Sequence, residues 1–251
     1  MKRYFIFGGL EMLWGIIFLT AMGAGLIQTV AGFGAATMMM LVVPSFLDMA
    51  QAPALTSAIA LGLSVGLFYK LHRQVDYKVV LPQAVIYVTV SVLTISLSGK
   101  FNMELLALVF GLFLICLSVY YLFLSKSIAV KPSPLSALIC GAGSGFFGGL
   151  FSVGGPLSAI YFLAASKNKE SYVANLQLLF IISNTVNTMV RIHYGIYTAE
   201  LVPLSLVGIV GINLGKWAGL RILNRIDIER MKRIIYIFIG VSGILTIVNH
   251  L

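Results

Sequence analysis

One stretch near residue 180 carries polar side chains within an otherwise apolar sequence. The residues are Gln177, Asn184, Asn187 and Arg191, at successive spacings of seven, three and four, so a helix would place them on one face. Amide and guanidinium groups are costly to bury in hydrocarbon unless they meet a partner or a polar cavity. This face therefore predicts either ligand contact or hydrogen bonding between helices.

The two kinds of polar group on this face suit different roles. We expect Asn184 and Asn187 to contact a ligand, and Gln177 to lie along its pathway. Arg191 is near the end of the expected helix, where a long cationic side chain can snorkel to the membrane interface. It could also recruit anions to the mouth of the pathway.

Two glycine-rich breaks supply a second set of groups that could bind a ligand. The first lies at Ala31 to Gly34 and the second at Ser152 to Pro156, where glycine and proline do not favour a continuous helix. A half-helix that begins at such a break offers free backbone N–H groups and a positive dipole end, which suit an anion. The same glycines could instead serve only close helix packing. The expected ligand groups are Gln28, Gly32, Gly34 and Thr37 at the first break, and Ser152, Gly154 and Gly155 at the second.

Composition indicates the environment of these groups. Hydrophobic residues make up 59% of the 251 residues and charged residues 10%, and the mean hydropathy is +1.00. Apolar stretches of about 20 residues, the length of a membrane span, recur along the chain. The sequence therefore predicts an all-α polytopic membrane protein. The net charge of +9 is attributed to basic cytoplasmic loops rather than to nucleic-acid binding.

Enzymatic chemistry has no recognisable residue pattern in this sequence. Cys116 and Cys140 stand singly in apolar runs, and no histidine pair has the spacing of metal ligands. No serine, histidine and carboxylate set lies at a plausible depth. We expect a protein that is not an enzyme and that binds neither a metal nor a cofactor.

The chain also repeats itself at an offset of 120 residues. The first repeat (1–125) is expected to hold a broken hairpin at about 10–47 and helices at about 52–69, 79–98 and 103–124. Residues 126–134 form a linker. The second repeat (135–251) is expected to hold a hairpin at about 135–166 and helices at about 172–191, 200–220 and 232–249. The aligned glycines are Gly23, Gly25 and Gly34 in the first repeat, and Gly143, Gly145 and Gly154 in the second.

Charge distribution favours hairpins that return to the side from which they enter. With three crossings in each repeat, thirteen Lys and Arg residues fall on the cytoplasmic side and four on the other. If each glycine-rich segment spans once, this bias weakens. An odd number of crossings inverts the second repeat relative to the first, so the two breaks enter from opposite faces and can meet near the midplane. Residues 4–14 could instead form an extra or lengthened helix that places the N-terminus inside.

These features resemble those of the TauE/SafE family of membrane transporters, described as sulfite or organosulfonate exporters. The resemblance covers nearly the whole chain, and it is carried by a glycine-rich turn in each half. The first copy, Gly32-Phe33-Gly34-Ala35 followed by Pro44, is close to the family pattern. The second, Ser152-Val153-Gly154-Gly155-Pro156, has proline in place of the last glycine and lacks the later proline. The resemblance implies export of a small oxyanion or sulfonate across the cytoplasmic membrane.

Taken together, these features predict a secondary transporter or facilitator for a small anion, with the bilayer as its other partner. No internal carboxylate stands out for proton coupling. An inside-negative potential favours exit of an anion by about 2.3 kcal/mol per charge per 100 mV, so uniport is physically sufficient. The alternatives are a gated anion channel and a membrane scaffold that transports nothing. The sequence leaves the oligomeric state open.

Overall fold

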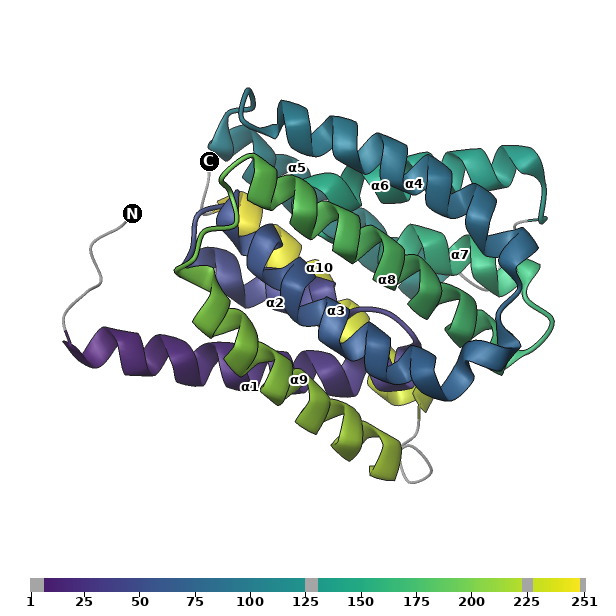
Figure 1. Ribbon diagram of the computed structural model, residues 1–251, viewed down its shortest axis with the longest axis horizontal. Coiled ribbons are helices and arrows are strands. Elements are labelled where there is room, and N and C mark those ends of the chain that lie inside the picture. Colours follow the sequence, from purple (N-terminus) through teal and green to yellow (C-terminus); the bar gives the residue numbers. More distant parts are fainter. Residues whose placement is uncertain (1–6, 125–130, 223–227, 249–251) are drawn as a thin grey trace.

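The computed structural model describes residues 7–124, 131–222 and 228–248 (Figure 1). Within these ranges every regular element is helical. Seven of the described helices are long and apolar enough to cross a membrane. They are the main parts of α1, α3, α4, α5, α6, α8 and α9. The expectation of an all-α polytopic membrane protein is thereby confirmed at this level.

The order of elements is the same in the two halves of the chain. The first half contains α1 (Phe7–Ala31), α2 (Ala35–Val42), the 3-10 turn Val43–Ser45, α3 (Gln51–Leu71), the 3-10 turn His72–Gln74, α4 (Tyr77–Ser98), α5 (Met103–Val119) and the π-turn Tyr120–Leu124. The second contains α6 (Pro134–Phe151), α7 (Gly155–Ala165), α8 (Lys169–His193), α9 (Leu201–Ile222) and α10 (Ile228–Val248).

The breaks after α1 and α6 are built from residues in the left-handed backbone region. Gly32 and Gly34 have φ angles of 85° and 109°, which glycine adopts without steric cost. Ser152, directly after α6, has a φ angle of 59°. Residues other than glycine rarely adopt such φ angles, so local interactions must stabilise this backbone conformation of Ser152.

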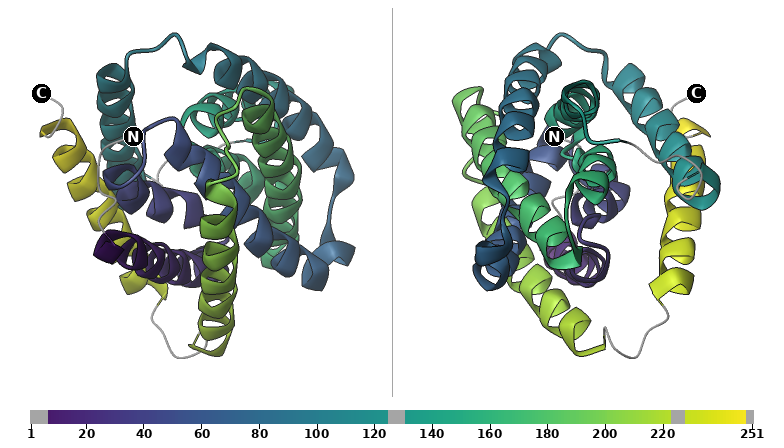
Figure 2. Two further views of the ribbon diagram at one scale, coloured as in Figure 1. Left: turned by 60° about the vertical axis from the view of Figure 1, so that its left-hand side comes forward. Right: turned by 90° about the vertical axis from the view of Figure 1, so that its right-hand side faces the viewer.

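Helix pairing follows one pattern in both halves. The main pairs are α1 with α9, α4 with α6, α5 with α10, α3 with α8, α4 with α8 and α3 with α9. If α1 to α5 are matched in order with α6 to α10, the α1–α9 pair corresponds to α4–α6, and the α3–α9 pair corresponds to α4–α8. The α3–α8 and α5–α10 pairs correspond to themselves. Figure 2 shows α10 beside α5 at one side of the bundle. A two-fold repeat predicts such a pattern.

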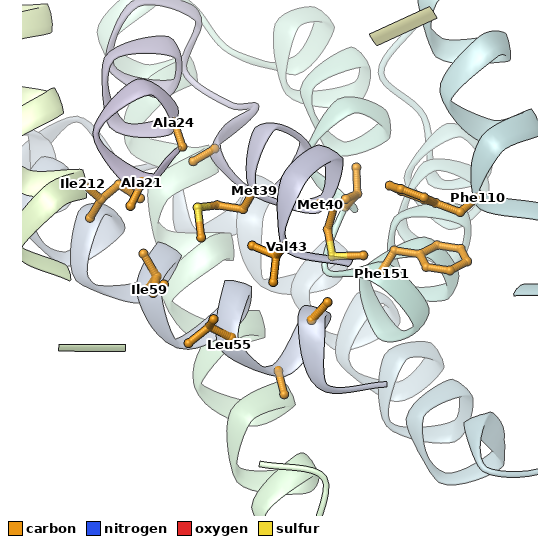
Figure 3. Close-up of a cluster of buried hydrophobic side chains, with 14 of the residues drawn as sticks. Ala21, Ala24, Met39, Met40, Val43, Leu55, Ile59, Phe110, Phe151 and Ile212 are labelled. Atoms are coloured by element: carbon orange, nitrogen blue, oxygen red, sulfur yellow. The ribbon is translucent and has the colours of Figure 1, made fainter. Parts of the chain in front are cut away.

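The short helix α2 fills the interior beside the first break. Met39, Met40 and Val43 are almost fully buried, and they pack between α1, α3, the middle of α5 and the end of α6 (Figure 3). Leu55 from α3 and Phe151 from α6 belong to the same hydrophobic cluster. Burial of this apolar surface fixes α2 inside the bundle.

Close packing of α1 against α9 depends on residues without a side chain. A Cβ atom on Gly25 would overlap the carbonyl oxygen of Ile212 on α9. Cβ atoms on Gly211 and Gly215 of α9 would overlap carbonyl oxygens on α1. Small residues allow membrane helices to approach closely in this way.

We predict that Gly25→Ala lowers the melting temperature of the protein in detergent, because the new methyl group meets backbone that cannot move aside. The expected cost is about 1–3 kcal/mol, as for other overpacked sites. The matched control is Gly23→Ala on the same helix, where a Cβ meets nothing within 4 Å. That control should melt at or slightly above the wild-type temperature, because alanine favours helix. Equal melting of the two variants would contradict this account of the α1–α9 contact.

Candidate functional site

The polar face of α8 lies inside the protein. This helix packs against α3, α4 and α7 (Figure 1). Gln177 and Asn187 are fully buried, and Asn184 and Arg191 are 7% and 2% exposed. The seven-three-four spacing thus places four polar side chains in the interior, between both halves of the chain.

Two glutamines hold the first break in place. Gln28 Nε2 donates to Gln177 Oε1 at 3.1 Å, and Gln177 Nε2 donates to the carbonyl oxygen of Gly32 at 3.0 Å. The backbone N–H of Ala35 donates to Gln28 Oε1 at 3.3 Å. Gln28 therefore caps the start of α2, and this N–H is already occupied within the protein.

Ser152 is the centre of the bonds that hold the second break. Its Oγ donates to the carbonyl oxygen of Pro53 at 2.7 Å and lies 2.7 Å from the Oγ of Ser57. Asn187 Nδ2 donates to the carbonyl oxygen of Gly148 at 3.4 Å and its Oδ1 accepts from Ser91 at 2.8 Å. These bonds account for the left-handed backbone of Ser152 and tie α6 to α3, α4 and α8.

Arg191 completes this group with its buried guanidinium. Nη1 donates to the carbonyl oxygen of Pro53 at 3.3 Å, to Ser152 Oγ at 3.1 Å and to Ser57 Oγ. Nη2 donates to the carbonyl oxygen of Gly149, in the last turn of α6, at 2.7 Å. The expectation that Arg191 snorkels to the interface is wrong, because its side chain turns inward and caps the end of α6.

No carboxylate balances this charge in the part of the chain that the structure describes. Among the described residues, every hydrogen-bond partner of the guanidinium is a hydroxyl or a carbonyl oxygen. The acidic residues whose burial is described are all exposed or half-buried: Asp48, Asp76, Glu104, Glu170 and Glu200. A buried cation surrounded only by neutral acceptors favours an anion beside it.

The bonds that hold the two breaks correspond to each other at the 120-residue offset. Ser57 on α3 bonds Ser152 at the second break, and Gln177 on α8 bonds Gly32 at the first. Ser57 and Gln177 are 120 residues apart, as are Gly32 and Ser152, which is the offset at which the sequence is expected to repeat. Each break is therefore held by the helix of the other half.

The two breaks also lie close to one another. A Cβ on Gly155 would be 3.4 Å from the Cβ of Phe33 and 3.1 Å from the ring of Phe180. Tyr121 stacks on Phe33 with ring centroids 5.5 Å apart, and its hydroxyl donates to the carbonyl oxygen of Pro156 at 2.9 Å. Aromatic rings thus fill the space where the breaks meet, and the polar groups flank them.

The remaining expected site residues have distinct environments. A Cβ on Gly154 would lie 2.6 Å from the Tyr87 hydroxyl and would overlap the carbonyl oxygen of Ser144, so packing alone requires glycine there. Thr37 is buried within α2. The Asn184 amide forms no hydrogen bond with any residue that the structure describes. Thr37, 2% exposed, and Asn184, 7% exposed, are thus expected ligand side chains for which the described residues supply no hydrogen-bond partner.

Sequence reasoning missed the roles of Ser57 and Ser91, which complete the hydrogen bonds of Arg191 and Asn187. Single serines in apolar helices carry little signal. The 120-residue offset was available, however, and it pairs Ser57 with Gln177. Among the described residues, no group of three or more His, Cys, Asp or Glu side chains is placed to hold a metal ion.

We predict that Gln28 and Gln177 stabilise the first break as one unit. Gln177→Leu leaves Gln28 Nε2 and the Gly32 carbonyl without partners, which should cost about 1–3 kcal/mol of unfolding free energy. The double variant Gln28→Leu/Gln177→Leu should lose less than the sum of the single losses, because the pair disappears together. Thermal unfolding in detergent measures all three variants. Strictly additive losses would show that the pair is not coupled.

Comparison with known proteins gives one match. The sequence profile of the family described as Sulfite exporter TauE/SafE matches residues 17–246. No curated protein and no solved structure matches the chain. The matched segment includes both breaks, α3, α8 and all the polar residues described above, and on this match the chain belongs to the TauE/SafE family.

Proposed function

We propose that this protein exports a small anion, of the sulfite or organosulfonate class, across the cytoplasmic membrane. The observation that carries the proposal is the Arg191 guanidinium, which is 2% exposed and has only neutral partners among the described residues. Ionisable groups inside membrane proteins commonly mark substrate pathways. Family membership supports the same class of substrate.

The position of this charge suits passage of an anion. The guanidinium adjoins the second break and is held by groups of both halves, Ser57 on α3 and Gly149 on α6. A positive charge that has no acidic partner lowers the barrier for an anion entering the interior. His72, His193 and Glu200, three titratable residues near helix ends, are exposed, so these three do not place a proton carrier in the interior. Export driven by the inside-negative potential needs no coupling carboxylate.

The architecture that we propose consists of two inverted repeats, each opening with a re-entrant hairpin. The return arms support it: α2 has 8 residues and α7 has 11, so they span about 12 and 17 Å. Neither arm can cross a hydrocarbon core of about 30 Å. The exchange pattern of helix pairs supports the repeat, and the cytoplasmic bias of basic residues supports the inversion.

The test compares Arg191→Lys with Arg191→Gln. Both variants lose the planar fork and several of its bonds, but only lysine keeps the charge. We expect the wild-type protein in liposomes to release sulfite in a saturable manner that follows an imposed inside-negative potential. The Gln variant should transport at least about tenfold more slowly than the Lys variant, because it lacks the interior positive charge that lowers the barrier for the anion.

Both variants are first checked for folding by their melting curves in detergent. Equal loss in two folded variants would show that Arg191 serves only to cap α6. Flux that does not saturate would favour a gated channel. Wild-type liposomes without any flux of sulfite or sulfonates would favour a scaffold and would overturn the proposal.

A further inference from the structure

Helices α3 and α8 form an antiparallel pair with a defined register. At one end Ser57 of α3 bonds Arg191 of α8. At the other end the backbone N–H of Asp76, just beyond α3, donates to Asn175 Oδ1 at 2.8 Å. The two helices lie side by side along this length (Figure 1).

This register brings Ser64 and Asn184 to the same level of the pair. Ser64 lies seven residues after Ser57 and Asn184 lies seven residues before Arg191, so each is two turns along, on the facing side. Ser64 and Asn184 are also 120 residues apart. They are thus equivalent positions in the proposed two-fold repeat. The two-fold axis would pass between α3 and α8 at this level.

Ser64 and Asn184 have no hydrogen-bond partners among the described residues, whereas Ser57, Arg191 and Gln177 on either side of them do. Ser64 is fully buried, and its Oγ has no hydrogen-bond partner. The Asn184 amide, 7% exposed, has none among the described residues either. Five residues of the described chain have buried side-chain atoms without a partner, and three of them lie on α3 or α8: Thr56, Ser64 and Thr188.

Helix packing alone does not account for this arrangement. Polar residues that serve packing bond one another, as Ser57 does with Arg191 and Gln28 with Gln177. A buried hydroxyl or amide without a partner costs free energy, so an unpaired group inside a protein calls for an explanation. A ligand that supplies the missing acceptors would provide one.

Resting on the proposed function, we propose that the anion binds between α3 and α8, where the Ser64 hydroxyl and the Asn184 amide donate to its oxygens. Thr188, one turn from Asn184, adds a further unpaired hydroxyl on the way to Arg191. Arg191 lies about 10 Å from this level, two turns along α8, and its positive charge attracts the anion without direct contact. A small oxyanion has several acceptor oxygens, so it can accept hydrogen bonds from Ser64 on α3 and from Asn184 on α8 at the same time.

The structure offers an unusual test, because removal of these groups breaks no hydrogen bond of the free protein. Ser64→Ala and Asn184→Leu should therefore leave the melting temperature of the ligand-free protein unchanged or raised. The probe is sodium sulfite, titrated against the full chain in detergent, with sodium chloride at equal ionic strength as reference. In the wild type sulfite should raise the melting temperature in a concentration-dependent manner. In each variant the sulfite concentration for half of this rise should increase at least about tenfold.

Gln83 provides the matched control. It is fully buried on α4, both of its side-chain polar atoms lack partners among the described residues, and its side chain lies against Gly141 of α6. Gln83→Met should behave like Ser64→Ala in the free protein and like the wild type in its response to sulfite.

The outcomes separate this site from the transport function itself. A wild-type protein that responds to neither sulfite nor methanesulfonate overturns the proposed function. A wild-type response that persists unchanged in both Ser64→Ala and Asn184→Leu overturns the site and leaves the function standing. An equal loss in Gln83→Met also overturns the site, because the effect would then follow from any buried polar group.

Discussion

The buried Arg191 guanidinium is the interaction on which the rest of this structure depends. Its donors satisfy the end of α6, the start of α3 and the hydroxyls of Ser57 and Ser152. These contacts hold the second break in a backbone conformation that serine rarely adopts. The group thus has two consequences at once: it fixes the geometry of the breaks, and it leaves a positive charge in the interior that no described acidic side chain neutralises.

Helix α8 carries this arrangement to the first break. Gln177 lies fourteen residues before Arg191 on the same face, and it binds the Gly32 carbonyl as Ser57 binds Ser152. Between these two fixed levels lie Ser64 and Asn184, whose polar groups have no hydrogen-bond partner in the described part of the chain. Hydrogen bonds on both sides therefore fix the positions of two polar side chains that have no partner of their own. Such fixed positions suit binding of a ligand to a preorganised site.

Much of the fold could be predicted from the sequence, because apolar length, glycine breaks and the internal repeat are local or periodic signals. The helix at 169–193 and the breaks near Gly34 and Gly154 are examples. The site was less accessible to such reasoning. The burial of Arg191 depends on which helix packs on α8, and the requirement for Gly154 depends on Tyr87, 67 residues away in the chain. Periodicity identifies a polar face, but only the tertiary structure shows which of its members are already paired.

The exchange of bonds between the halves has a further consequence, for biogenesis. Because Gln177 holds the first break and Ser57 holds the second, the first hairpin lacks its amide partner until α8 has been synthesised. During insertion the Gly32 carbonyl and the Gln28 side chain must then find water, lipid headgroups or the insertion machinery instead. The two halves thus depend on each other for these bonds, and assembly of the interior awaits α8, the sixth long apolar helix of the described chain.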